Sequence, residues 1–156
     1  MWALCFAGRW CYAVCMKHRA AILSVSLIVA SALTLRAGTE LESEMKHMKD
    51  AYRGLKTAME APVEADKQTY LDLAAKLKDA AVAAKELKPE KLSEIPADQQ
   101  AAFLESYRQQ VDELIKLTDS LAQSITAGNW EEAKNQLMAI NQSRREGHKE
   151  FMSDDE

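Results

Sequence analysis

Two residues near opposite ends of the sequence carry uncharged side chains that can ligate a metal ion. Met45 offers a thioether sulfur in the stretch "LESEMKHMK", and His148 offers an imidazole nitrogen in "RREGHKEF". Taken singly, each has an ordinary explanation, because methionine commonly fills helical cores and a lone histidine is usually solvated. A shared site therefore depends on whether the fold brings the two residues to the same place.

The first 32 residues of the 156-residue chain differ in character from the rest. From Met16 the sequence runs through basic Lys17 and Arg19 into an apolar stretch and ends in Ala30-Ser31-Ala32. This order predicts a secretory signal peptide over residues 1–32, with Met16 as the true start and the residues before it a misassigned extension. An uncleaved membrane anchor is the alternative, although it would need ~20 apolar residues.

Cleavage after Ala32 would change both the charge and the chemistry of the mature chain. It removes three basic residues and no acidic ones, so 17 basic and 24 acidic residues remain and the net charge becomes −7. All three cysteines (Cys5, Cys11 and Cys15) are also lost, which excludes disulfides, thiolate metal sites and covalent haem attachment. We expect a periplasmic monomer that binds neither nucleic acid nor membrane after processing.

The apolar residues of the mature chain recur at spacings of three and four, as in amphipathic helices. Four such stripes occupy residues 41–59, 70–87, 103–125 and 130–151, and no segment alternates with period two. Two short connections, 61–66 and 127–129, predict an all-α, antiparallel up-down-up-down four-helix bundle. The inward stripe of the last helix is expected to consist of Trp130, Ala133, Leu137, Ile140, Arg144, His148 and Phe151.

In such a bundle, Met45 and His148 lie at the same end and at the same depth. Met45 is about one turn into the first helix and His148 about one turn from the end of the last, so both lie roughly 6 Å from the rim. The long connection "LKPEKLSEIPADQQ" crosses this end. Further apolar and aromatic residues are expected in this layer: Met48, Tyr52, Phe103 and Tyr107.

A thioether and an imidazole across an apolar slot match the two axial ligands of six-coordinate haem iron. Met45 and His148 are therefore candidate residues for binding haem as a cofactor and for ligating its iron. Arg144 has two readings, either a side chain that reaches solvent along the bundle surface or a partner for a haem propionate. We predict no catalytic residues, because the mature chain has no cysteine nucleophile and its carboxylates fall mostly on solvated helix faces.

Residues 41–152 resemble the cytochrome b562 family, whose members are four-helix bundles that hold haem non-covalently. The similarity is carried by "LESEMKHMK", "KPEKL", "FLESY", "AGNWEEA" and "RREGHKEF". The resemblance implies one haem b per chain, Met45 and His148 as axial ligands, and electron transfer with unidentified redox partner proteins. It also places Phe103 and Tyr107 on the family's haem-packing aromatic positions and Arg144 on its arginine. Gly147 and the acidic tail "SDDE" (153–156) depart from the family pattern.

Two other functions are compatible with the helical pattern. A haem-free exported bundle, serving as an interaction or stress-related module, would keep the same stripes with Met45 and His148 incidental. A di-metal carboxylate bundle needs paired Glu-x-x-His motifs facing inward. Glu44 and His47 have that spacing, but they lie off the stripe and no second pair exists. The polar lead-in, residues 33–40, carries no motif.

Overall fold

The computed structural model describes residues 40–152. The first helix covers residues 40–60 and is followed by a 3-10 turn, η1 (Glu64–Asp66), and by α2 (Lys67–Lys85). A second 3-10 segment, η2 (Glu90–Glu94), precedes α3 (Gln100–Thr126) and α4 (Trp130–Phe151). The described residues contain four long helices and no strand, which confirms the all-α prediction. None of these helices is both long and apolar enough to cross a bilayer.

The predicted signal peptide (1–32), most of the lead-in and the acidic tail lie outside the described residues. Within them, the helix ends follow the local sequence. The first helix ends at residue 60, just before Pro62, which cannot donate a backbone hydrogen bond. Gly128 adopts a φ of 71°, the left-handed conformation that commonly ends helices. The Asn129 side chain then accepts a 3.2 Å hydrogen bond from the Glu132 amide and caps α4.

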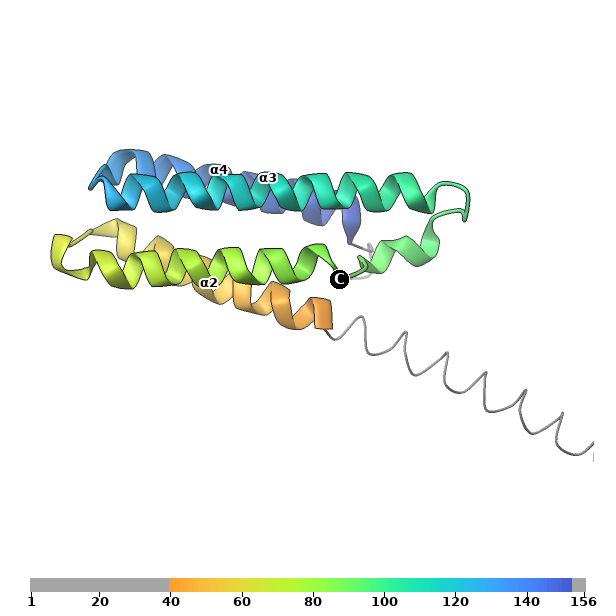
Figure 1. Cartoon of the computed structure of the whole chain (residues 1–156), viewed down its shortest axis with the longest axis horizontal. Coiled ribbons are helices and arrows are strands. Elements are labelled where there is room, and N and C mark those ends of the chain that lie inside the picture. The colour runs from red at the N-terminus through yellow and green to blue at the C-terminus, as the bar shows by residue number, and fades with distance from the viewer. Residues whose placement is uncertain (1–39, 153–156) are drawn as a thin grey trace, which may run out of the picture. The chain divides into compact units, whose positions relative to one another are not determined.

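The four helices form two layers, with the first helix and α2 in one and α3 and α4 in the other (Figure 1). The two short connections, 61–66 and 127–129, lie together, and we call this the turn end of the bundle (Figure 1). The long connection, 86–99, lies at the opposite end, which we call the loop end (Figure 1). The start of the first helix and the last turns of α4 are also found at the loop end (Figure 1).

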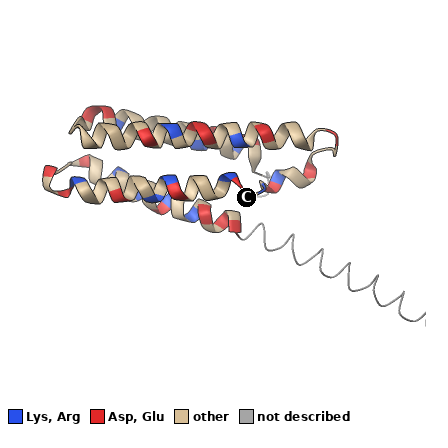
Figure 2. Cartoon of the chain, in the orientation of Figure 1, with Lys and Arg blue, Asp and Glu red and all other residues tan. Residues whose placement is uncertain are grey.

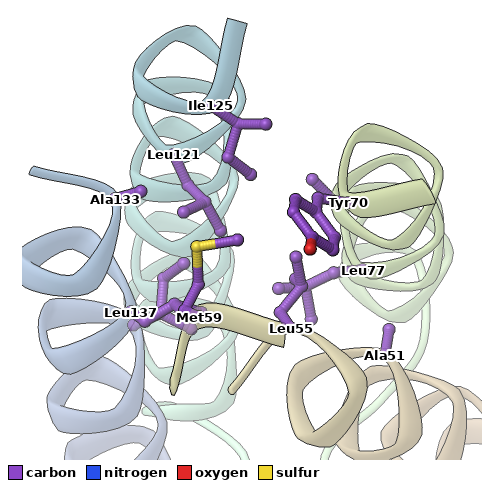
Figure 3. Close-up of a cluster of buried hydrophobic side chains, with 11 residues drawn as sticks. Ala51, Leu55, Met59, Tyr70, Leu77, Leu121, Ile125, Ala133 and Leu137 are labelled. Carbon is purple, nitrogen blue, oxygen red and sulfur yellow. The ribbon is translucent and has the colours of Figure 1, made fainter. Parts of the chain in front are cut away.

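The contiguous hydrophobic core belongs to the half of the bundle nearer the turn end. Side chains from all four helices converge there, as Figure 3 shows. The core consists of Ala51, Leu55, Met59, Tyr70, Ala74, Leu77, Leu121, Ile125, Ala133, Leu137 and Ile140. Leu55, Leu121 and Ile125 have no exposed surface, so each gains the full benefit of burial, about 1.5–3 kcal/mol.

Ion pairs connect α2 to α3 along the surface of the bundle. Lys78 Nζ lies 2.7 Å from Asp119 Oδ1, and Lys85 Nζ lies 2.7 Å from Asp112 Oδ1. Charges of both signs are interspersed along these two helices (Figure 2). Because all four side chains are partly exposed, each pair contributes at most about 1 kcal/mol to stability.

The inward face of α4 differs from the predicted stripe in its last turns. Ala133, Leu137, Ile140 and Phe151 are buried and Trp130 is half-buried, as the spacing indicates. The expectation that Arg144 and His148 are buried along this stripe is wrong, because both side chains are exposed, whereas Ser143 is buried. The Ser143 hydroxyl can be buried because it finds a hydrogen-bond partner, whereas burying the Arg144 guanidinium would carry a high desolvation cost.

Candidate functional site

An aromatic cluster fills the loop end of the bundle. The Phe151 ring packs edge-on against Phe103, with ring centroids 5.3 Å apart, and against Tyr107, with centroids 5.4 Å apart. Phe151 and Tyr107 are buried, while Phe103 is half-buried. Edge-to-face pairs of this kind stabilise by about 0.5–1.5 kcal/mol beyond the area they bury. The structure therefore brings the predicted pair Phe103 and Tyr107 together, around a ring supplied by α4.

Tyr107 is also fixed by its hydroxyl group. The phenol donates a 2.7 Å hydrogen bond to the carbonyl oxygen of Ala84, near the end of α2. Burial raises the pKa of Tyr107 to about 12, since the low-dielectric surroundings disfavour the phenolate. The hydroxyl remains a neutral donor at physiological pH, and its hydrogen bond connects α3 to α2 beside the aromatic cluster.

The first helix carries three of the predicted site residues, and all three are half-buried. Met45 is half-buried, one turn after the fully buried Leu41. Met48 and Tyr52 are also half-buried, and both pack against the hydrophobic core. Met45 is the nearest of the three to the start of the helix. Unlike Met48 and Tyr52, it does not pack against the core cluster.

The side chains of His148 and Arg144, in the last turns of α4, are exposed. Arg144 Nη2 donates a 3.2 Å hydrogen bond to Asn141 Oδ1 in the preceding turn. The backbone carbonyl of His148 accepts a 3.1 Å hydrogen bond from the Met152 amide, so the helix is still regular at the histidine. The structure thus places an imidazole on α4 and a thioether on the first helix at the same end of the bundle, the imidazole exposed and the thioether half-buried.

The sequence reading missed a polar contact between α3 and α4. Gln110 Nε2 donates to both the carbonyl oxygen and the hydroxyl of Ser143, at 3.2 and 3.1 Å. A signal was present, because Ser143 lies three residues after Ile140 and a serine can be buried more cheaply than the arginine that follows it. The partner on α3 could not be identified from spacing alone.

His47, the other histidine of the described chain, is exposed on the first helix. Its ring Nδ1 lies 3.4 Å from Glu44 Oε2 in the preceding turn. Within residues 40–152, no three His, Cys, Asp or Glu side chains are arranged to hold a metal ion. Haem iron needs only two protein ligands, so this finding bears on carboxylate metal centres and leaves the Met45 and His148 donor set unaffected.

The donor set and its surroundings define a class of protein. A four-helix bundle that carries a thioether, an imidazole and a layer of aromatic rings at one end has the chemistry that a non-covalent haem requires. The chain belongs to the cytochrome b562 family, since the family described as cytochrome b562 matches residues 40–152. This match spans all four helices, confirms the resemblance seen in the sequence motifs and indicates a haem-binding electron-transfer protein. No curated protein matches the chain.

Proposed function

We propose that this protein is a periplasmic one-electron carrier that binds one haem b non-covalently at the loop end of an up-down-up-down bundle. The observation that carries the proposal is the family match over residues 40–152, which includes both Met45 and His148. Two features of the fold support it: the aromatic cluster at the loop end, and the half-buried Met45 at the same end.

Met45 and His148 are the proposed axial ligands. Bound haem supplies the one-electron iron couple. Met45 offers a neutral sulfur and His148 a neutral nitrogen, and this pair raises the reduction potential relative to two histidines. If both residues held the iron, oxygen would have no coordination site, which would favour electron transfer over enzymatic chemistry.

The remaining site residues would bind and shield the cofactor. Phe103 and Tyr107 offer ring surfaces that exclude water, and the Tyr107 hydroxyl is already engaged by the Ala84 carbonyl oxygen. Met48 and Tyr52 extend the apolar wall from the first helix towards the core. Arg144 is exposed, so its guanidinium can reach a propionate at the bundle surface without a large desolvation cost.

The cellular setting of the proposal rests on the sequence. A cleavable leader over residues 1–32 would export the chain, and the cytochrome b562 family is a soluble periplasmic one. The exported domain would act as a monomer that exchanges electrons with redox partner proteins. Its net charge of −7 after cleavage disfavours contact with nucleic acid or anionic lipid.

A visible absorption spectrum of the dithionite-reduced protein tests the haem assignment. Sharp low-spin bands are expected from the wild-type chain, and acidified organic solvent should extract the haem because no covalent link forms. His148→Ala should abolish the low-spin bands, and Met45→Ala should leave high-spin or weakly bound haem. His47→Ala is the matched control and should change neither, because the His47 side chain is exposed and lies beside Glu44 of the same helix.

A haem-free exported bundle, an interaction or stress-related module, is the second candidate function. The exposure of His148 and Arg144 favours it, since neither side chain needs a cofactor to account for its position. The same spectrum separates the two candidates. Wild-type protein that takes up no haem after reconstitution, or keeps its low-spin bands when His148 is replaced, would support the haem-free function or another ligand set.

A further inference from the structure

The last turns of α4 are held to α3 by an unusual polar contact. Ser143 is 7% exposed and is one of two buried polar residues in the described part of the chain. The other, Thr118, donates within its own helix, to the Leu114 carbonyl oxygen at 2.9 Å. Ser143 instead accepts from a different helix, because one amide group of Gln110 serves its carbonyl and its hydroxyl together.

The contact strengthens α4 where its sequence is weak. In a regular α-helix, the Ser143 carbonyl accepts from the amide of Gly147, and a glycine inside a helix costs about 1 kcal/mol relative to alanine. Gln110 donates to the same carbonyl, and a Cβ added at Gly147 would lie 3.6 Å from Gln110 Cγ. The glutamine side chain therefore packs against the bare backbone of α4 and hydrogen-bonds to it one turn earlier.

We propose that Gln110 is a positioning residue, which fixes the rotation of the last turns of α4 and thereby the direction in which His148 projects. Ser143 lies five residues before His148, about 7.5 Å along the helix axis. A rotation of α4 at Ser143 would move the imidazole around the helix by the same angle. The role towards haem rests on the function proposed above, whereas the anchoring of α4 to α3 does not.

The first test uses hydrogen exchange in the full-length, haem-free protein. Gln110→Leu removes the donor, and Gln110→Glu keeps the length but cannot donate to a carbonyl as a carboxylate. Both should speed exchange of the amides of 143–151 about fivefold, the effect of losing one hydrogen bond of ordinary strength. Gln109→Leu is the matched control, because Gln109 is exposed and bonds only within α3, to Glu105 Oε1 at 3.1 Å among its described contacts.

Residues 121–137, at the turn end, should exchange at the wild-type rate in all three variants, which shows that each variant folds. Ser143→Ala removes the hydroxyl acceptor but keeps the carbonyl, so its effect on 143–151 should be smaller than that of Gln110→Leu. Equal exchange of 143–151 in Gln110→Leu and Gln109→Leu would overturn the anchoring role.

The second test addresses the histidine in the haem-loaded protein. Gln110→Leu and Gln110→Glu should release haem to an excess of a haem-scavenging protein several-fold faster than wild type and should lower the low-spin fraction, with Gln109→Leu unchanged. Faster exchange with unaltered haem release and spectrum would overturn the positioning role. A wild-type chain that binds no haem would overturn the proposed function and the positioning role with it, while the exchange experiment would still decide whether Gln110 anchors α4.

Discussion

The two ends of the bundle are built from different interactions. At the turn end, Leu121 and Ile125 are fully buried, and Tyr70 packs edge-on against Trp130 with ring centroids 6.1 Å apart. The Val63 amide donates to the Tyr70 hydroxyl at 3.1 Å, and Lys67 Nζ donates to a backbone carbonyl of α3 at 3.3 Å. These contacts close the connections 61–66 and 127–129 tightly against the core.

The loop end lies outside the contiguous core and depends on aromatic rings and polar contacts. Phe151, Tyr107 and the Gln110 side chain connect the helices there, while Met45 and Phe103 stay half-buried. Regions that bind ligands are commonly drawn from the less stable parts of a fold, because a fully packed end leaves no surface for a cofactor. The contiguous core that stabilises the bundle thus lies nearer the turn end, whereas the residues proposed to bind haem lie at the loop end.

The largest effect should come from truncating the core near the turn end. We expect Leu121→Ala to lower the free energy of unfolding by about 2–5 kcal/mol, since a fully buried leucine leaves a cavity. Leu104→Ala, on the same helix near the loop end, should cost clearly less because Leu104 is only half-buried. Urea unfolding followed by circular dichroism measures both values. Equal losses would break the distinction between the two ends.

Haem should stabilise the loop end selectively. Without haem, amide exchange should be fast around Met45, 88–99 and His148, and slow near Leu55, Leu121 and Leu137. Haem binds only the folded form, so a concentration a hundred times the dissociation constant should add about 2.7 kcal/mol. Mass spectrometry of exchanged peptides resolves both ends. Equal protection at the two ends, unchanged by haem, would remove the loop end as the binding region.

Alkaline pH should weaken the loop end through Tyr107. Because burial raises its pKa to about 12 from 10.0, the neutral phenol favours the folded state. Its contribution, on the order of 2 kcal/mol, is fully present below pH 10 and is lost as the pH rises through about 12.

Tyr107→Phe isolates this effect. At neutral pH the variant should be about 1 kcal/mol less stable than wild type, because the hydrogen bond to the Ala84 carbonyl is lost. Between pH 10 and 12 the wild-type advantage should disappear and then reverse, because the wild type loses on the order of 2 kcal/mol whereas phenylalanine has no proton to lose. Curves that stay parallel over this range would mean that the phenol remains protonated or that its burial has no energetic consequence.

Much of the fold follows from the sequence because helix signals are local. Pro62, Gly128 and Asn129 favour helix ends through their backbone and capping chemistry, and they lie in the two short connections that the sequence predicted. The apolar spacing also predicted Leu137 as an inward residue, and the buried Leu55 and Leu121 lie within two of the other predicted stripes. Family membership was foreseeable for the same reason, since the matching motifs are short continuous stretches.

The site could be predicted only in part, because periodicity does not decide between two neighbouring residues at the edge of a stripe. Ser143 is buried against Gln110, a partner 33 positions away that spacing cannot identify, whereas Arg144, which the predicted stripe includes, is exposed. His148 is exposed, so its role as a ligand is a proposal that the structure does not test. Phe103 and Tyr107 were placed in one layer from the sequence, and both contact Phe151.

The smallest effect should come from Gly147→Ala, and it should be confined to the loop end. Alanine gains up to about 1 kcal/mol over glycine inside a helix, and the added methyl would meet Gln110 Cγ at 3.6 Å, an ordinary contact. If the end of α4 frays before the bundle unfolds, the gain should slow exchange of 143–151 by about fivefold and leave the melting temperature nearly unchanged.

Gly54→Ala is the informative counterpart, because its methyl would lie 3.1 Å from Leu73 Cδ1 and force that side chain to move. That variant should gain less, and any change should appear in global unfolding, since Leu73 packs against the core. A Gly147→Ala variant whose melting temperature rises in step with its local protection would show that α4 unfolds only with the rest of the bundle, and the two ends would then be one cooperative unit.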